Sequence, residues 1–408
     1  MILLSHPTGN ANIRNAALAT LEHRLLGEFW TSVCWRTDCV AGRFLPRAIR
    51  TQLERRAFPE VPRALVRTCP FRELGRFVAP RLGFGYFAVR KEAFFGIDSV
   101  YQYFDREVAE RIRHAEGLSA VYTGEDCALE TFRAASLRGW KRFYDLPIGY
   151  WRAGHMIYQE EAEREPAWKD TLGGIADSEQ KLMRKDSELE LADTVVVASS
   201  FTRRTLEKAP KVPADVRVIP YGAPAVPERF VPREAGKKLK VLFAGALGQR
   251  KGLSYLLQAM RQVADKAELT MLGRKTVEGC ETLDEAVRIH RWIPSLPHKE
   301  VLQEMARHDV LVFPSLFEGF GLVILEAMSR GLPVITTEHT GGPDVIRDGV
   351  DGYIVPIRSA DAIAAKLTLL HEDRGLLTEM KQAAINAARQ ISWEGYRRRL
   401  GEMLLAKF

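Results

Sequence analysis

Cysteine is scarce in this chain, and long uninterrupted apolar runs are missing. The 408 residues hold five cysteines, an odd number without any C-x-x-C pair: Cys34, Cys39, Cys69, Cys127 and Cys280. This usage argues against a disulfide framework and fits a reducing compartment. The most apolar stretch, residues 310–328, is broken by proline, glycine and glutamate, so the sequence predicts no membrane-spanning helix. The first residues also lack the basic start of a signal peptide, and we therefore expect a cytoplasmic protein.

Lysine is absent from the first 90 residues, which instead hold 14 arginines and six acidic residues. Their net charge of +8 exceeds the +7 of the whole chain, so the basic character belongs to the N-terminal part. Such a surface is either simply solvated or attracts an anionic partner, such as lipid headgroups or a phosphorylated acceptor. Nucleic acid is disfavoured as that partner, because no known nucleic-acid-binding module is present. With 46% hydrophobic residues the chain has ample apolar mass for folded cores, and its length favours two or three domains.

Strand and helix patterns alternate in two series along the chain. Short β-branched or aromatic runs predict strands at 2–6, 120–122, 142–144, 194–198 and 216–220, and then at 241–244, 269–272, 310–313, 334–336 and 353–355. Helical stretches lie between them, near 253–264, 298–307, 321–330 and 360–371 in the second series. This alternation predicts parallel sheets that are covered on both faces.

Residues 220–232 contain four prolines and predict the linker between the two series. The expected fold class is α/β, with two tandem Rossmann-like doubly wound domains, residues 1–222 and 223–392. Ligands of such sheets bind at the carboxyl ends of the strands. Two of these domains that face a shared cleft suit an enzyme with one substrate on each.

The densest chemistry lies in residues 313–328. After the predicted strand, a loop carries Glu318, and Gly319 and Gly321 permit a close approach of the backbone. A helix that begins near Gly321 offers free amides and a positive dipole end, which together suit a phosphate group. Glu326 lies on the first turns of that helix. The two carboxylates either accept from sugar hydroxyls around such a ligand, or serve as a helix cap and a surface acid.

A second segment, residues 241–252, reads as strand, glycine-rich turn, two adjacent cations and helix. Arg250 and Lys251 stand where the next helix begins. Cations oppose the helix dipole there unless an anion is present, so their position predicts a bound diphosphate. The alternative is a pair of solvated cations. The spacing matches neither the P-loop nor the dinucleotide-binding fingerprint.

Together these segments resemble the retaining glycosyltransferases of family 4, the group 1 glycosyltransferases, which have the two-domain GT-B fold. Glu318 and Glu326, with seven residues between them, match the family's E-x7-E motif, and its E-G-F-G core is intact at 318–321. Residues 247–252 look like the segment that neutralises the donor diphosphate. The resemblance is strong over 190–395 and weaker over 1–190. It implies that a last helix, capped by Ser392 and covering about 393–408, crosses back to the first domain.

The resemblance implies a role for each site residue. Arg250 and Lys251 would stabilise the departing nucleoside diphosphate, where each fixed positive contact contributes about 2–4 kcal/mol. Glu318 would touch the donor sugar, and Glu326 the ribose hydroxyls. The other donor-binding residues would act mainly through their backbone, at the diphosphate, the sugar or the base: Gly9, Gly245, Ile293, Gly319, Phe320, Gly321 and Leu322.

One position departs from the family pattern. Many members have a histidine facing the reacting carbon where this chain has Asp145. As a catalytic residue, Asp145 would orient the acceptor hydroxyl or stabilise the cationic centre; otherwise it is a turn or capping aspartate before Pro147. Glu125 and Asp126 also follow a predicted strand and would lie at the cleft, unless Asp126 is an N-cap.

No D-x-D motif and no His/Cys cluster with metal spacing occurs in the sequence. Many glycosyltransferases of the other fold bind a divalent ion through D-x-D. Its absence, together with the presence of Arg250 and Lys251, favours catalysis without a metal, and we expect no cofactor besides the nucleotide-sugar co-substrate.

Residues 45–58 form an amphipathic, arginine-flanked stretch. It is either an ordinary helix with its apolar stripe in the core, or a helix on a membrane surface that carries a lipid-linked acceptor. The second alternative would place the protein at the inner face of a membrane.

The sequence therefore predicts a retaining, metal-independent glycosyltransferase of glycan or polysaccharide biosynthesis. It would move a sugar from a nucleoside-diphosphate-sugar donor to a hydroxyl of a glycan, a lipid-linked or a small-molecule acceptor. A nucleotide-sugar epimerase of the same fold and a non-catalytic nucleotide-binding subunit are the alternatives. The motifs specify neither the base, the sugar nor the acceptor.

Overall fold

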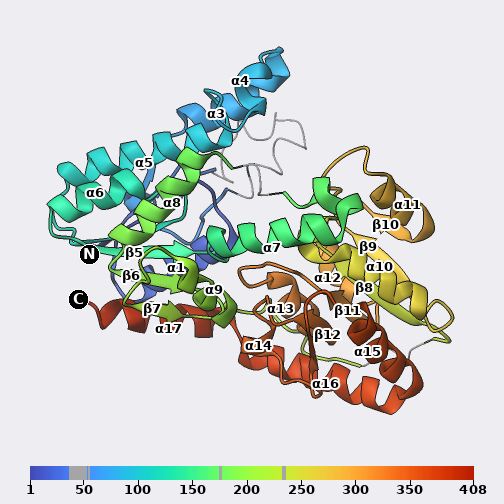
Figure 1. The fold of residues 1–408 in the computed structure, drawn as a ribbon. Helices are drawn as coiled ribbons and strands as arrows, with labels where there is room; N and C mark the ends of the chain where they lie inside the picture. The colour runs from blue at the N-terminus through green and yellow to red at the C-terminus, as the bar shows by residue number, and fades with distance from the viewer. Residues whose placement is uncertain (36–52, 54–55, 174–176, 232–235) are drawn as a thin grey trace.

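The computed structural model describes residues 1–35, 53, 56–173, 177–231 and 236–408. Two parallel sheets flanked by helices lie side by side, one built from the first half of the chain and one from the second (Figure 1). Most of the predicted stretch 45–58 falls outside the described residues, so its two alternatives stay open.

The first sheet has seven strands, all parallel. In spatial order they are β3 (Val66–Thr68), β2 (Leu26–Thr31), β1 (Ile2–Ser5), β4 (Ala120–Gly124), β5 (Lys141–Leu146), β6 (Thr194–Val197) and β7 (Val216–Val218). The strand order reverses at β1, where a doubly wound sheet opens a crevice at its carboxyl edge. Helices of this half are α1 (Ala11–Glu22), α3 (Phe71–Val78), α4 (Tyr86–Val89), α5 (Ile97–Arg113), α6 (Leu129–Leu137), α7 (Trp151–Arg164), α8 (Glu179–Leu191) and α9 (Ser200–Thr205).

The second sheet has six parallel strands and reverses its order at β8. In spatial order they are β10 (Arg291–Ile293), β9 (Ala267–Leu272), β8 (Leu239–Ala244), β11 (Val310–Phe313), β12 (Val334–Thr337) and β13 (Gly352–Val355). Its helices are α10 (Leu253–Gln262), α11 (Glu281–Ile289), α12 (His298–Met305), α13 (Leu322–Met328), α14 (Gly342–Val345), α15 (Ala360–Glu372) and α16 (Arg374–Gln390), and α17 (Trp393–Leu405) follows.

Alternate residues of the central strands enter different cores, which is why these strands are apolar throughout. Ile2 and Leu4 join one buried cluster, whereas Leu3 joins the cluster on the other face. In β8, Val241 and Leu242 divide in the same way. Both faces are therefore covered, as continuous apolar runs predict for parallel strands.

The last helix, α17, returns to the first half of the molecule. The Ser392 side chain accepts the N–H of Gly395 at 3.1 Å, so the predicted serine cap is present. The helix packs on α1, and Arg397 pairs with Glu22 at 2.7 Å. Its buried Leu400 and Leu404 attach it to the core of the first sheet.

Every predicted strand is present, but β2, β3 and β10 were not predicted. β3 and β10 have three residues each, too few for a periodic pattern. β2 contains Glu28, which is buried because Arg111 and the Trp30 indole bind its carboxylate. The described part of the proline-rich segment, residues 220–231, forms neither helix nor strand, as expected of a linker.

Within the described residues, no helix combines the length and the apolar character that crossing a bilayer requires.

Candidate functional site

Three of the predicted catalytic groups meet between β8 and β11. Arg250 and Lys251 lie on the short helix η6 (Gln249–Lys251) that follows β8, and Glu318 lies in the loop after β11. The Lys251 ammonium pairs with the Glu318 carboxylate, and Arg250 Nη1 lies 3.4 Å from the same oxygen. Arg250 also donates to the Phe317 carbonyl at 3.0 Å. Neighbouring strands thus deliver two cations and one acid to the same edge of the sheet.

The chain itself supplies the anion that the sequence pattern required. The interpretation that two cations beside a helix start demand an external diphosphate is therefore incomplete, because Glu318 balances them here. Burial and the charge of Arg250 lower the pKa of Lys251 well below its usual range. An arriving diphosphate would compete with Glu318 for these cations and favour the charged form of Lys251.

The loop that carries Glu318 rests on the first domain. A Cβ on Gly319 would lie 1.8 Å from the Pro147 carbonyl oxygen just beyond β5, so only glycine fits this approach. The Gly319 carbonyl accepts from the Thr202 hydroxyl at 2.9 Å and from the Ser199 hydroxyl. Ser199 and Thr202 were missed, because no local pattern shows a contact made by residues more than 100 positions away.

Gly321 begins α13 in a left-handed conformation, with φ of +84°. Its Cβ position would also lie 2.8 Å from the Phe313 ring, which excludes larger residues. Leu322 follows as the first helical residue. Phe320 packs its ring against Tyr221 at 5.3 Å, and its carbonyl accepts the Gly341 N–H at 2.7 Å. These residues lie where the resemblance places the donor sugar and phosphate, and that role stays a prediction.

Glu326 is not an isolated surface acid. Its Oε1 lies 2.8 Å from Nε2 of His298, at the start of α12. The carboxylate raises the pKa of His298 above its usual value. Ile293 ends β10, where its carbonyl already accepts the Gly273 N–H at 2.9 Å. Any contact of the Ile293 backbone with a base would have to share that carbonyl.

Asp145 is neither a cap nor a turn residue. It lies inside β5 and is buried among three tyrosines whose pKa values are raised first by burial and then by its charge: Tyr122, Tyr221 and Tyr396. Burial raises the pKa of Asp145 to about 7, and the neighbouring Tyr122 hydroxyl opposes the shift. Among the described residues, no hydrogen bond or ion pair joins Asp145 to Glu318, although Pro147 lies two positions further along and closely approaches Gly319. Its catalytic role therefore remains a prediction.

Glu125 and Asp126 follow β4 at the carboxyl edge of the first sheet, as expected. Lys185 of α8 lies 3.2 Å from Glu125, and Lys181 lies 3.5 Å from Asp126. Asp126 is not an N-cap: α6 begins after Ala128, and Glu188 accepts the backbone N–H groups of Asp126 and Ala128.

Gly9 and Gly245 lie at the carboxyl ends of the first strand of each sheet. Gly9 follows β1, and a Cβ there would lie 2.4 Å from the Phe58 ring. Gly245 follows β8 and donates its N–H to Leu272 at 2.9 Å. The buried ring of His6, which sequence reasoning missed, lies at the same edge beside Gly124.

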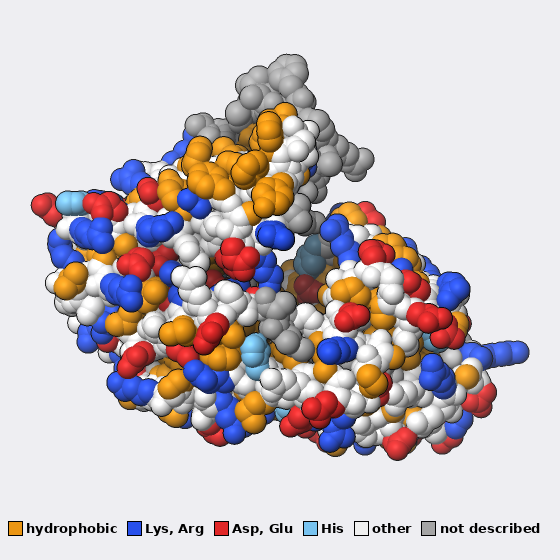
Figure 2. Space-filling view, turned by 45° about the horizontal axis from the view of Figure 1, so that its top comes forward, with side chains coloured by type: hydrophobic (Ala, Val, Ile, Leu, Met, Phe, Trp, Pro, Cys, Tyr) orange, Lys and Arg blue, Asp and Glu red, His pale blue; other side chains and the backbone are white. Residues whose placement is uncertain are grey.

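Helix α7 connects the two halves and reaches toward the second sheet (Figure 1). Its buried Glu161 accepts from the Gln249 amide at 2.6 Å and pairs with Arg358 at 2.8 Å. Gln249 precedes Arg250, so α7 fixes the turn that carries both cations. Figure 2 shows a hollow between the two halves.

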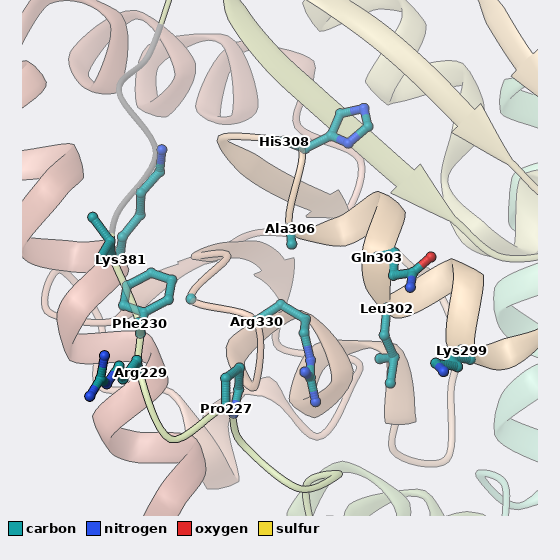
Figure 3. A pocket seen from close by; sticks show the side chains of 12 residues that line it. Pro227, Arg229, Phe230, Lys299, Leu302, Gln303, Ala306, His308, Arg330 and Lys381 are labelled. Atoms are coloured by element: carbon teal, nitrogen blue, oxygen red, sulfur yellow. The ribbon is translucent and has the colours of Figure 1, made fainter.

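A separate pocket of about 390 Å³ lies at the opposite edge of the second sheet. Its lining includes Phe230, Arg330, Lys381 and His308, the last just before β11, whereas Glu318 follows the other end of that strand (Figure 3). Arg330 and Lys381 point in opposite directions; one donates to the Ala225 carbonyl and the other pairs with Asp309. The two cationic groups do not point toward a common ligand position. We therefore interpret this pocket as the space between the linker and the second domain.

Among the residues that the structure describes, no group of three or more His, Cys, Asp or Glu side chains is arranged to hold a metal ion.

Comparison with known proteins places this geometry in a family. The model of the family described as glycosyl transferases group 1 matches residues 227–390, which contain Arg250, Lys251, Glu318 and Glu326. Over this stretch, less than half of its length, the chain is similar to the group 1 glycosyltransferases. The matched region is the whole second sheet with its helices, and the E-x7-E motif predicted from the sequence lies inside it.

Solved structures of similar architecture cover the chain from end to end. Anabaena Alr3699/HepE in complex with UDP aligns over 99% of both chains, with a TM-score of 0.64 and 15% identity. Sucrose-phosphate synthase from Thermosynechococcus elongatus gives the same TM-score over 100% of this chain and 98% of that chain, with 17% identity. At these identities the likeness shows the fold alone, and the predicted GT-B class is confirmed.

Among curated relatives, a D-inositol 3-phosphate glycosyltransferase from Streptomyces bingchenggensis is 27% identical over 62% of this chain and 64% of its own length. An uncharacterized 41.2 kDa protein from the cps region of Klebsiella pneumoniae is 34% identical over 31% of this chain. The chain spans about a third of the length of several relatives, 35% of the Klebsiella protein and 36% of the Erwinia amylovora glycosyltransferase AmsK.

Proposed function

We propose that this protein is a retaining glycosyltransferase that uses a nucleoside-diphosphate-sugar donor and a hydroxyl acceptor. One observation carries the proposal: Arg250 and Lys251 converge on the Glu318 carboxylate at the carboxyl edge of a group 1 domain. Two fixed cations at that edge suit a diphosphate leaving group, on which negative charge develops during transfer.

The role of each half follows from this proposal. Residues 223–392 bind the donor, with Glu318 on the sugar and Glu326 on the ribose. Residues 1–222, with the returning helix 393–408, bind the acceptor, and Asp145 acts near the reacting carbon. The backbone at Gly9, Gly245, Ile293 and residues 319–322 completes the donor site. No metal is required, and the protein works in the cytoplasm, where a lipid-linked acceptor would bring it to the membrane.

Release of nucleoside diphosphate from a panel of donors tests the proposal, with glycan, lipid-linked and small-molecule acceptors added in turn. We expect Arg250→Ala and Lys251→Ala each to lower turnover by about 30- to 1,000-fold, which corresponds to 2–4 kcal/mol of lost leaving-group stabilisation. Lys266→Ala, a matched control whose cation pairs with Glu372 far from the site, should keep the full rate.

Near wild-type turnover by Lys251→Ala would contradict the assigned role of the cations. Product formed from the donor alone, without any acceptor, would instead support a nucleotide-sugar epimerase. Nucleotide binding without turnover of any donor would support a non-catalytic subunit.

A further inference from the structure

One projection of the first half exposes an unusual amount of apolar surface. Eight of the 19 large apolar side chains that are exposed among the described residues fall within positions 71–94: Phe71, Leu74, Val78, Leu82, Phe84, Tyr86, Phe87 and Phe94. They belong to α3, the short helix η3 (Ala79–Leu82), α4 and the following turn, and they form the orange area near the top of Figure 2. Contiguous apolar surface of this kind marks an interaction site on a folded protein.

The aromatic rings of this projection are already ordered against one another. Phe94 and Phe95 lie 4.9 Å apart, and Phe71 lies 6.4 Å from Phe94. Phe94 and Phe95 line a hollow of about 530 Å³ whose lining contains only apolar residues and glycine. Although the rings contact one another, Phe71, Phe84, Phe87 and Phe94 remain exposed to solvent.

Basic residues surround the apolar area. Residues 71–95 hold five cations and two acids, a net charge of +3: Arg72, Arg76, Arg81, Arg90 and Lys91 against Glu73 and Glu92. Glu73 is buried and pairs with Arg56 and Arg76, and Lys91 pairs with Asp177 at 2.8 Å. The basic character of the surface therefore comes from Arg72, Arg81 and Arg90. Arg81 and Arg90 are exposed, and Arg72 lies over the Phe94 ring at 4.3 Å.

We propose that residues 71–95 dock the protein onto an anionic lipid bilayer, with the aromatic side chains entering the headgroup region. Apolar and aromatic residues bordered by arginine are the composition of interfacial membrane-binding segments. The charge favours anionic lipids, each basic residue contributing near the surface. A second copy of this chain is a less suitable partner for this surface, because it would place two segments of net charge +3 against each other.

The hollow between the two halves opens beside this projection in Figure 2. Docking would hold that hollow close to the lipid surface. If the proposed glycosyltransferase function holds, the hydroxyl group of a lipid-linked acceptor could then reach the hollow while its lipid part stays in the membrane. Membrane docking itself does not depend on that function.

Vesicle sedimentation tests the docking surface with the full chain. Phosphatidylcholine vesicles containing 30% phosphatidylglycerol should sediment the protein, and pure phosphatidylcholine vesicles should bind it much more weakly. Phe84→Ser with Phe87→Ser should weaken the partition coefficient by about tenfold or more, because two exposed rings no longer enter the bilayer. Arg81→Gln with Arg90→Gln should weaken it by about tenfold, and added salt should weaken the binding of the wild type more than that of this arginine variant.

The control is Leu137→Ser on α6, which removes an equally apolar side chain that is 87% exposed outside the projection and should leave sedimentation unchanged. Equal binding by the phenylalanine variant and this control would overturn the proposal. So would equal binding to neutral vesicles, or a wild-type dimer in analytical ultracentrifugation that the phenylalanine variant dissociates. Donor turnover without added lipid, measured in the same preparations, reports separately on the proposed function.

Discussion

At the scale of single residues, Glu318 binds both Arg250 and Lys251. Its position beside Arg250 and Lys251 explains how a buried and a partly exposed basic side chain lie next to each other on one short helix. The sequence motif identified all three residues, because each follows a strand of the same sheet. It did not reveal that they neutralise one another, since 68 positions separate Arg250 from Glu318.

Asp145 should make stability depend on pH. Its folded pKa of about 7 lies above the usual 3.8, so the stability that its neutral form contributes is present below pH 4 and lost as pH rises through 7. Asp145→Asn should therefore match the wild type near pH 4 and be more stable at pH 8, by up to about 4 kcal/mol for a shift of this size. Urea unfolding at both pH values measures this difference.

A pH-independent difference between these two proteins would contradict the buried charge as its cause. Turnover gives a second readout: if Asp145 acts at the reacting carbon, the more stable variant should be the slower enzyme.

His298 should hinder nucleotide binding at low pH. Its pKa lies above 6.5 because Glu326 holds its proton, and the pair contributes to stability below 6.5 and weakens as pH rises through the raised value. If Glu326 binds the ribose, His298→Ala should bind the matching nucleoside diphosphate about threefold more tightly than wild type at pH 6 and equally at pH 8. Calorimetric titration of both proteins in the same buffers cancels the ionisation of the nucleotide itself. Equal affinities of His298→Ala and the wild type at pH 6 would contradict the prediction that Glu326 binds the ribose.

At the scale of elements, α7 stabilises the cation-bearing turn from across the molecule. Arg358 is mostly buried and pairs with the fully buried Glu161, which also holds Gln249. Arg358→Met removes the charged partner of the buried Glu161 carboxylate and should lower the free energy of unfolding by about 3 kcal/mol. Arg133→Met, which breaks the exposed pair with Glu130, should cost less than about 1 kcal/mol. Chemical denaturation compares the two, and equal losses would show that the α7 contact has no special role.

Elements with clear periodicity were predictable, and those stabilised by distant partners were not. The strands from β8 to β13 alternate with helices in the expected order, except that the three-residue β10 and the helices α11 and α14 were not predicted. β2 was not predicted, because the burial of Glu28 within it depends on a hydrogen bond from Arg111, 83 positions away. Capping geometry was predictable where it is local, as at Ser392, and not where Glu188 caps the start of α6 from α8.

At the scale of the whole molecule, two sheets present their carboxyl edges to each other, and every assigned residue except Asp145 lies at or beyond a strand end. The two-domain class followed from the repeated strand–helix alternation together with the proline-rich linker. The contacts across the halves, at Gly319 and Glu161, could not be predicted, because they join segments that no motif connects.

The most direct measurement is a thermal-shift panel with UDP, GDP, ADP and their monophosphates, with and without EDTA, on the wild type and Lys251→Ala. A ligand that binds only the folded protein adds about 2.7 kcal/mol of stability at 100 times its Kd. We predict that one diphosphate raises the melting temperature well above its monophosphate, regardless of EDTA, and that Lys251→Ala loses this difference. No shift with any nucleotide, or an equal shift in the variant, would contradict a diphosphate site at Arg250 and Lys251.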